Sequence, residues 1–316
     1  MIKNYLILTF RNFLRNRNYT LINILGLTIG VTACIIIFLL VTYDLSFDKF
    51  HSKYRSIYRI VQDSRSSSGE ARESTTPYPI AKAFRNDFPD IPLVTQMHYQ
   101  DEILVKYGED KMTAENIVFA DSLFFEVFDF KVLSGNPKEE LGQPGKVFLT
   151  KSLADKLLKG KEQATLKIDN SLEVEVAGII QDPPPTSHIN FSMVISMPSF
   201  NSSFLGGLPI DQWTMTASGY TYIVLPENRQ ASDIDKQLEV FKAKYHSKQD
   251  AAAKTYKLQS LADIHFNKEY TGNPGQNSNA SSSDLLVMAI LGIFILVIAC
   301  INFINLATAL AIRKSK

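Results

Sequence analysis

The histidines of the chain are the residues best suited to acid–base or metal chemistry, but their spacing favours neither. They are His51, His98, His188, His246 and His265. No two of them stand at a metal-ligand spacing with a Cys or Asp partner nearby. Asp44 and Asp48 precede His51, but a cation site here would require three ligands to converge beside a hydrophobic stretch. We therefore interpret this segment as a solvated junction, and we expect no metal and no cofactor.

Sequence motifs for nucleotide binding and for nucleophilic catalysis are absent from the chain. The Gly-Lys pairs at 145–146 and 160–161 are followed by Val and Glu, whereas a phosphate-cradling loop requires Ser or Thr there. The serines include no G-x-S-x-G elbow, and paired carboxylates occur only in charged runs that are typical of a solvated surface. The sequence therefore predicts a protein that is not an enzyme, has no catalytic residue and does not hydrolyse ATP itself.

Two stretches without any charged residue, 18–43 and 285–312, dominate the hydropathy pattern. Each exceeds the about 20 apolar residues that a helix needs to cross a bilayer core. A core helix of this length would normally carry a polar face, so we predict two transmembrane helices. The first stretch also has the basic flank of a signal peptide, but its length and the missing small-x-small cleavage site favour an uncleaved helix.

The distribution of charge predicts the orientation of these helices. Residues 1–30 and 285–316 contain basic residues and no acidic one. Because the formal net charge of the chain is only +1, the segment between them is acidic. Basic flanks stay in the cytoplasm, so we expect two cytoplasmic termini and an external domain over 44–270. An acidic domain also argues against nucleic acid as a partner.

Three shorter segments complete the predicted organisation. Residues 1–17 have the spacing of an amphipathic helix on the cytoplasmic face, in contact with membrane lipid, although a simple extension of the first membrane helix explains the pattern equally well. Residues 271–284 are rich in Gly, Asn and Ser and are expected to be a flexible linker. Residues 313–316 would form a short cytoplasmic tail.

The segment 44–270 mixes strand and helix patterns without an internal repeat, which predicts an α+β fold, a mixed α/β domain between two transmembrane helices. Strands are expected at 57–61, 93–99, 103–107, 116–120, 146–150, 172–180, 191–196, 220–225 and 255–261. Helices are expected at 80–88, 151–158 and 231–245. We also expect a polar loop at 64–76 and a core rich in aromatic residues from 119–130. Both cysteines lie in the hydrophobic stretches, so the domain has no disulfide.

Small and polar residues in the hydrophobic stretches are candidates for helix packing. Gly26 and Gly30 form a small-x-x-x-small motif, which permits the close approach of two helices. Asn302 and Asn305 need hydrogen-bond partners in hydrocarbon, which contact with another membrane segment would supply. The alternative interpretation places these two amides at a membrane interface.

Several motifs, in order along the chain, resemble one family. They are NILGLTIG at 23–30, YDLSFDKFH at 43–51, IYR at 57–59, VAGIIQDPPPTSH at 176–188, LQSLADIHF at 258–266 and INFINLATA at 301–309. In these motifs the chain is similar to MacB/FtsX-type ABC transporter permeases. The resemblance marks Asp182, Pro183, Pro184, Pro185 and His188 as a structural motif. Three prolines after a strand force a rigid turn, which His188 would cap.

The resemblance implies a MacB-like periplasmic core domain in a bacterial inner-membrane permease, with residues 285–312 as the start of an FtsX-like permease domain. It also implies a separate cytoplasmic ABC ATPase, a homo- or heterodimer of permeases and, as a further partner, a periplasmic adaptor. The expected function is to couple the ATPase to movement of the periplasmic domain, for export or efflux of an unidentified substrate. Family permeases continue with further membrane helices, so the chain is expected to be the first part of a longer permease or a truncated product.

Two other functions compete with this one. A membrane-tethered periplasmic sensor or ligand-binding protein would require a cytoplasmic signalling domain, and the short predicted tails leave no room for one. An extracytoplasmic enzyme is disfavoured by the missing site residues. Neither the substrate nor the oligomeric state follows from the sequence.

Overall fold

The computed structural model describes residues 17–66, 69–160, 164–214, 219–272, 274 and 280–314. The chain divides into two compact units, Met1–Leu45 with Ala280–Lys316, and Ser46–Asn279. The first unit contains α2 (Arg17–Asp44) and α10 (Ser282–Lys314), and the second contains the sheet and the other described helices. The amphipathic helix predicted over 1–17 lies outside the described residues except for Arg17, which belongs to α2.

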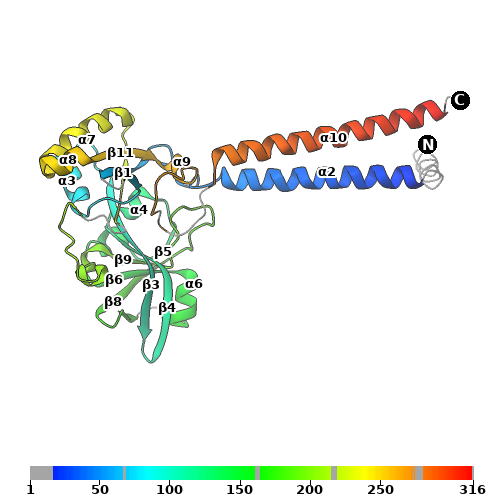
Figure 1. Ribbon diagram of the computed structural model, residues 1–316. Helices are drawn as coiled ribbons and strands as arrows, with labels where there is room; N and C mark the ends of the chain where they lie inside the picture. Colours follow the sequence, from blue (N-terminus) through cyan, green and yellow to red (C-terminus); the bar gives the residue numbers. More distant parts are fainter. Residues whose placement is uncertain are drawn as a thin grey trace. The chain divides into compact units, whose positions relative to one another are not determined.

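Helices α2 and α10 lie side by side in the first unit (Figure 1). Their apolar segments Ile24–Asp44 and Ser282–Asn305 are long enough to cross a bilayer. Only 6% of an 18-residue apolar window in the first segment and 17% of one in the second is buried, unlike a soluble core helix. Both segments therefore expose apolar side chains, as lipid contact requires. Residues 282–284 are helical although we expected them in the linker, because Ser281 accepts a hydrogen bond from the Asp284 amide and caps α10.

Six strands of the second unit pair in a closed ring, in the order β3, β4, β9, β6, β8 and β7, and β7 pairs again with β3. Their bounds are β3 (Val94–Tyr107), β4 (Asp110–Ala120), β6 (Lys146–Thr150), β7 (Thr165–Ile168), β8 (Leu172–Ile180) and β9 (Met193–Ser196). Alternate side chains of these strands, including Val105, Phe119 and Leu149, form one fully apolar cluster. The ring is therefore a small barrel filled by side chains.

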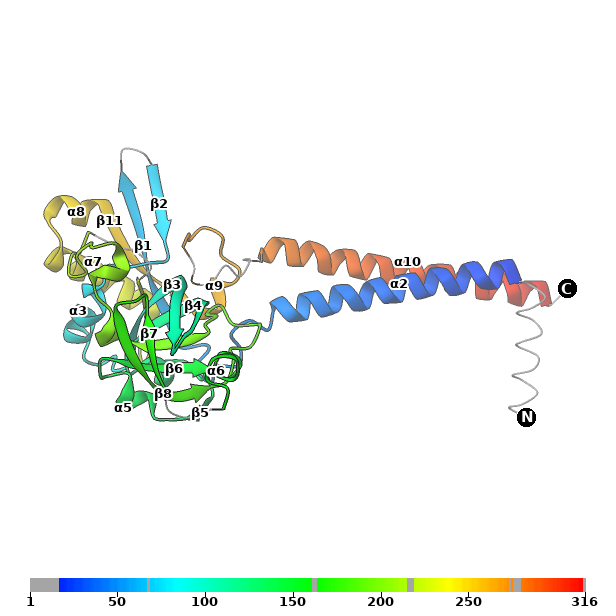
Figure 2. The ribbon, with the colours of Figure 1, turned by 90° about the horizontal axis from the view of Figure 1, so that it is seen from below.

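A second group of strands extends the sheet from β3, in the order β10 (Gly219–Val224), β1 (Ile57–Ser66) and β11 (Lys254–Ser260). The first half of β3 pairs with β10 and its second half with β7, so this long strand belongs to both parts. Helices α3 (Pro79–Asp87) and α7 (Ala231–Tyr245) pack their apolar side chains against β1 and β10. Figure 2 shows the hairpin that β1 forms with β2 (Gly69–Glu73).

The remaining elements are short and connect or cover these strands. They are α4 (Phe124–Val127), β5 (Val132–Ser134), α5 (Pro137–Glu140), α6 (Lys151–Leu158), the 3-10 turns η1 (Met197–Ser199) and η2 (Ser202–Leu205), α8 (Lys248–Ala253) and α9 (Leu261–Ile264). Phe124 and Phe128 are fully buried in a cluster between the barrel and β10, which confirms the aromatic core predicted for 119–130.

The structure confirms the predicted fold class, a mixed α/β domain flanked by two apolar helices. Several details differ from the prediction, among them the following two. The strands expected at 93–99 and 103–107 are the single strand β3, because the polar residues 100–102 continue its pairing with β4. The polar loop expected at 64–76 is largely a hairpin, since β1 runs to Ser66 and β2 occupies 69–73. This hairpin is polar and mostly exposed, so it lacks the apolar alternation of a strand.

Candidate functional site

Asp48, the fourth residue after α2, begins a buried polar network in the second unit. Its side chain is fully buried and its backbone is left-handed, with φ of 57°. Its Oδ1 accepts a hydrogen bond from the backbone N–H of His188 at 3.0 Å and lies 2.9 Å from Nδ1 of the same residue. The Asp48 N–H donates to the Thr186 carbonyl at 2.8 Å. Three contacts therefore fasten the start of the domain to the proline turn far along the chain.

The network continues from His188 to a buried arginine. Nε2 of His188 lies 3.0 Å from the Tyr222 hydroxyl, and the Arg59 side chain, from the paired position on β1, also hydrogen-bonds Tyr222. Burial raises the pKa of Tyr222 to about 12, although Arg59 opposes the shift, so the hydroxyl stays protonated at neutral pH. The Arg59 guanidinium also donates to Oε1 of Gln259 at 2.6 Å. A chain of polar contacts therefore runs from the buried Asp48 carboxylate through His188 and Tyr222 to the buried Arg59.

His51 lies in an aromatic pocket beside this network. Its ring is 2% exposed and lies between Phe50, Phe128 and Phe130, with ring centroids 3.9 to 5.2 Å away. Its Nδ1 accepts a hydrogen bond from the backbone N–H of Asp129 at 3.0 Å. Because a backbone N–H can only donate, this nitrogen carries no proton. Burial lowers the pKa of His51 to about 4, so its ring is neutral at physiological pH.

The residues after α2 also contact the segment that leads toward α10 in the chain. The Phe47 ring stacks on the His265 ring, with centroids 3.5 Å apart and planes inclined by 8°. Both residues are buried. We use the name entry cluster for the residues Phe47, Asp48, His51, His188, Tyr222 and His265. The entry cluster joins the first residues of the domain to its proline turn, its central sheet and its last helix.

Hydrogen bonds also hold residues 271 and 272, at the start of the predicted linker. The Thr271 carbonyl accepts hydrogen bonds from the Ser74 N–H at 3.1 Å and from the Ser74 hydroxyl at 2.8 Å. The Thr271 N–H donates to the Arg72 carbonyl at 3.0 Å, and the Tyr220 hydroxyl donates to the Gly272 carbonyl. Residues 271 and 272 are therefore attached to the domain, whereas the sequence placed them in a flexible linker.

The entry cluster corrects two interpretations of the sequence. The segment expected to be a solvated junction contains two fully or almost fully buried polar residues, Asp48 and His51. His188 does not cap its own turn, which the Ser187 N–H closes by donating to the Pro184 carbonyl at 3.0 Å. The sequence indicated Asp48 only as a neighbour of His51 in a possible cation site and as part of the motif at 43–51. In the described part of the chain, no three His, Cys, Asp or Glu side chains are grouped to hold a metal.

The rest of the predicted proline motif supports the barrel. Asp182 accepts a hydrogen bond from the Ser152 N–H at 3.2 Å, at the start of α6. The residues Pro183, Pro184 and Pro185 follow β8 without strand pairing, as the missing N–H groups require. Within β8 itself, a Cβ added at Gly178 would lie only 2.2 Å from the Ser134 carbonyl oxygen, so β5 and β8 approach too closely for any side chain.

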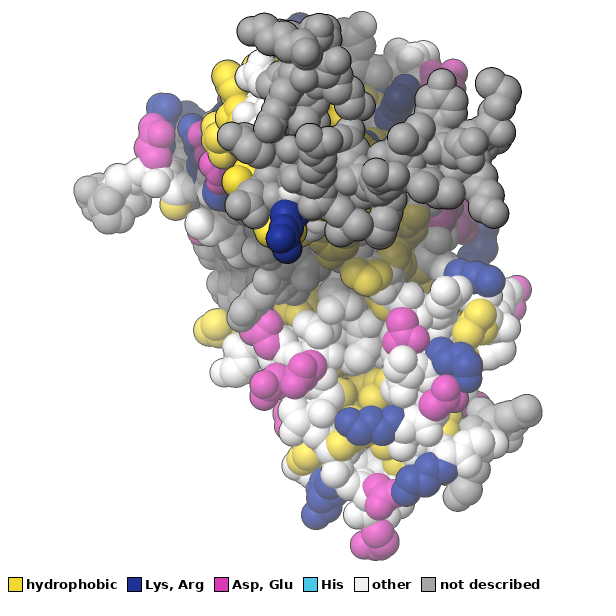
Figure 3. Space-filling model, turned by 90° about the vertical axis from the view of Figure 1, so that its right-hand side faces the viewer, with side chains coloured by type: hydrophobic (Ala, Val, Ile, Leu, Met, Phe, Trp, Pro, Cys, Tyr) yellow, Lys and Arg dark blue, Asp and Glu magenta, His cyan; other side chains and the backbone are white. Residues whose placement is uncertain are grey.

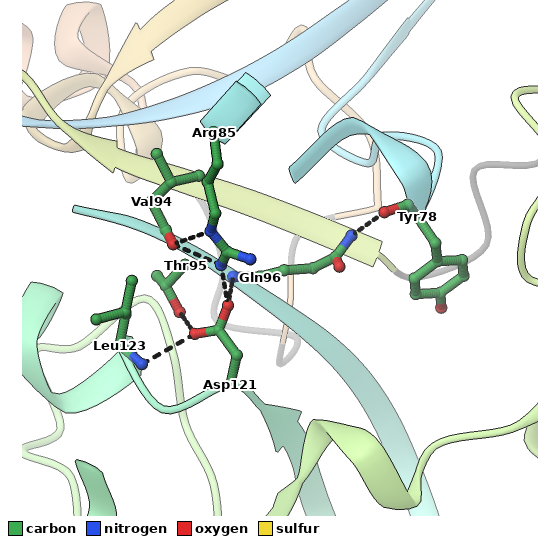
Figure 4. A network of polar contacts seen from close by, with 7 residues as sticks. All are labelled: Tyr78, Arg85, Val94, Thr95, Gln96, Asp121 and Leu123. Carbon is green, nitrogen blue, oxygen red and sulfur yellow. Dashed lines mark hydrogen bonds and ion pairs between the residues drawn. The ribbon is translucent and has the colours of Figure 1, made fainter. Parts of the chain in front are cut away.

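A second polar network fixes α3 to β3 and β4 (Figure 4). Asp121 follows β4, and its carboxylate accepts hydrogen bonds from the Thr95 hydroxyl at 2.7 Å, from the Gln96 N–H at 3.1 Å and from the Arg85 guanidinium. Arg85 also donates to the Val94 carbonyl at 2.6 Å. Both carboxylate oxygens are satisfied by protein groups, which indicates a structural role.

The predicted helix-packing residues differ in their surroundings. A Cβ added at Gly30 would lie 2.8 Å from the Ala299 Cβ, so α2 and α10 approach closely there. Gly26 has no described atom near its missing Cβ, and Asn302 and Asn305 are exposed. The structure therefore brings Gly30 against α10 and leaves the other three residues outside the described contacts of this helix pair.

On the face of the domain in the lower part of Figure 3, positive and negative side chains are mixed and form no separate patches. Lys and Arg side chains alternate there with Asp and Glu side chains. This face therefore lacks the continuous basic surface that nucleic-acid binding requires.

Comparisons with known proteins agree with the architecture. The model of the MacB-like periplasmic core domain family matches residues 20–240, a range that contains all of the entry cluster except His265. The chain is similar to the crystal structure of a domain of a protein described as a permease from Porphyromonas gingivalis, with a TM-score of 0.58 and 15% identity over 72% of this chain and 96% of that one.

Two further structures show weaker similarity. The periplasmic region of MacB from Actinobacillus actinomycetemcomitans gives a TM-score of 0.46 and 13% identity, over 66% of this chain and 90% of that one. The extracellular domain of the noncanonic ABC-type transporter YknZ from Gram-positive bacteria gives 0.44 and 12%, over 64% and 99%. No curated protein shows significant similarity to the chain.

Proposed function

Since the chain belongs to the family of the MacB-like periplasmic core domain, we propose that it is a non-catalytic permease subunit of an ABC-type transporter or mechanotransmission complex. A separate cytoplasmic ATPase supplies the energy, and the periplasmic domain moves in response. The result is export or efflux of a substrate that the fold does not identify. The domain family is non-catalytic in this region, which suits a part that transmits movement.

The observation that supports this proposal most directly is the entry cluster. Movement of a helix can be passed to a folded domain through packed side chains and hydrogen bonds. The residues directly after α2 are held by the Asp48–His188 contacts and by the Phe47–His265 stack. A displacement that arrives at Ser46 is therefore passed to the proline turn and to β10 instead of being absorbed by a loose connection.

The two apolar helices that flank the domain make the chain a membrane protein. We place it in the bacterial inner membrane with both termini in the cytoplasm, because the basic flanks of the two helices favour that side. Gly26, Asn302 and Asn305 are proposed to contact further membrane segments, either of the same permease or of the second permease in a homo- or heterodimer. A periplasmic adaptor would bind the external domain.

Affinity purification of the full-length protein from membranes of its own bacterium tests the proposal. We expect an ABC ATPase subunit to be recovered with it in mild detergent, and its ATP hydrolysis to be stimulated by the membrane part. Recovery of a histidine kinase or another signalling protein instead, with no ATPase, would favour the sensor function and refute the permease assignment.

A further inference from the structure

We propose that His51 is an acid-sensitive latch, in which protonation of its ring loosens the attachment of residues 51–53 to residues 126–129. At neutral pH the latch is closed and residues 51–53 are held by this loop. At acid pH the attachment opens more often, whereas the Asp48–His188 contacts and the Phe47–His265 stack do not involve the His51 ring and stay in place. This inference adds regulation by external pH, and its test does not depend on any ATPase.

The geometry of His51 leaves no place for a second proton. Its Nδ1 accepts the Asp129 N–H, so the single proton of the neutral ring resides on Nε2. A further proton can only go to Nδ1, where it would face the Asp129 N–H directly. Nε2 is buried and has no hydrogen-bond partner among the described residues, so it offers the cation no compensation. To accept a proton, the ring must leave Asp129 and reach water.

Charged and titratable groups around His51 come from three directions and act in opposite senses. Asp48 in its own turn and Asp129 after α4 favour the protonated ring, whereas His188 from the proline turn and Lys53 oppose it. Removal of the ring from water has the largest effect, and the pKa of His51 is lowered to about 4. The carboxylate nearest in sequence, Asp48, is already engaged by His188 through Oδ1.

Release of His51 would open a defined segment, because its neighbours depend on the same loop. The Ser52 N–H donates to the Asp129 carboxylate, and the Lys53 ammonium donates to the Glu126 carbonyl at 2.9 Å. These contacts and the His51 hydrogen bond all join residues 51–53 to residues 126–129. They are expected to open together, whereas β1 is held separately by its pairing with β10 and β11.

Hydrogen exchange followed by mass spectrometry, on the whole chain in detergent, tests the latch. Labelling at pH 7.5 and pH 5.0 is compared with labelling times scaled for the intrinsic pH dependence of exchange. If the ring has a pKa of 6.5 when open and about 4 when closed, the opening of residues 51–53 should increase on the order of 10- to 30-fold at pH 5.0. Peptides from β10 and β11 should change little.

Two variants assign the response to one residue. His51→Asn keeps an acceptor oxygen for the Asp129 N–H but cannot be protonated, so its opening should be equal at both pH values. His246→Gln is the matched control, because burial also lowers the pKa of His246 and its Nε2 lies 2.9 Å from the Tyr256 hydroxyl, far along the chain. This control should respond to acid as the wild type does.

Two results would overturn the latch. Equal opening of residues 51–53 in the wild type at pH 7.5 and pH 5.0 refutes it, whatever the variants do. An acid response of full size in His51→Asn refutes it as well, because another group must then be responsible.

Discussion

Replacement of Asp48 by Ala should destabilise the periplasmic domain strongly. The change removes the acceptor of both His188 contacts from a fully buried site. Each of the two buried donors of His188 that is left without an acceptor costs about 1–3 kcal/mol. Asp48→Asn keeps one acceptor oxygen and tolerates the left-handed backbone, so its cost should be about 1–2 kcal/mol.

Asp169 provides the matched control for this substitution. It also has a left-handed backbone, with φ of 45°, but its side chain is exposed in the turn between β7 and β8. Asp169→Ala therefore introduces the same kind of backbone strain, about 1 kcal/mol or slightly more, without breaking a buried contact. The difference between the two Ala variants measures the contribution of the buried network.

Urea unfolding in detergent, followed by tryptophan fluorescence, measures these free energies. Trp213 is the single tryptophan of the chain, and its ring stacks on Tyr245 at a centroid distance of 4.8 Å, so it reports unfolding of the domain. If Asp48→Ala loses no more stability than Asp169→Ala, the Asp48–His188 contacts do not hold the start of the domain and the reasoning fails.

Three further predictions concern other residues. Acid should destabilise the domain by about 3 kcal/mol between pH 6.5 and pH 4, because His51 has a depressed pKa in the fold and takes up its proton first in the unfolded chain. Urea unfolding at a series of pH values should show this loss of unfolding free energy. The dependence of the free energy on pH should be flatter in His51→Asn. Gly178→Ala should cost about 1–3 kcal/mol in the same assay, because its Cβ meets the Ser134 carbonyl, and a neutral result would contradict the close approach of β5 and β8. Gly30→Leu should separate α2 from α10 and increase the rate of alkylation of Cys34, measured in a Cys300→Ser background. Gly26→Leu should leave this rate unchanged. Equal alkylation rates in the two variants would mean that the helices make their close contact elsewhere.

The sequence was sufficient to predict the elements that carry a local pattern. The helices expected at 151–158 and 231–245 have those bounds in the structure, since their apolar spacing matches the face that each buries. The closed barrel was not predictable in the same way. It depends on β7, a strand of only four residues, which pairs with β3 and β8 at once. Pairing between distant segments does not change the local hydrophobic periodicity of either segment, so a local pattern cannot predict it.

The contacts of the entry cluster were not predicted from the sequence, for a related reason. An Asp beside a membrane helix is solvated in most proteins, and only a partner can keep it buried. That partner, His188, stands 140 positions later in the chain. The proline turn was recognised as rigid, but which residue its histidine contacts depends on how the whole sheet folds. A fully buried Asp with a left-handed backbone is a property of the fold, and the sequence around it shows neither feature.

The nucleotide response of the domain in the assembled complex tests the central claim most directly. The full-length protein and its co-purified ATPase would be placed in lipid nanodiscs, and hydrogen exchange of residues 46–56 and 183–188 would be compared with and without a non-hydrolysable ATP analogue. The account predicts that the analogue changes exchange in both segments of the wild type, and that Asp48→Ala retains the ATPase but loses the response at 183–188. Identical exchange with and without the analogue in the wild type would contradict a role in transmitting ATPase movement.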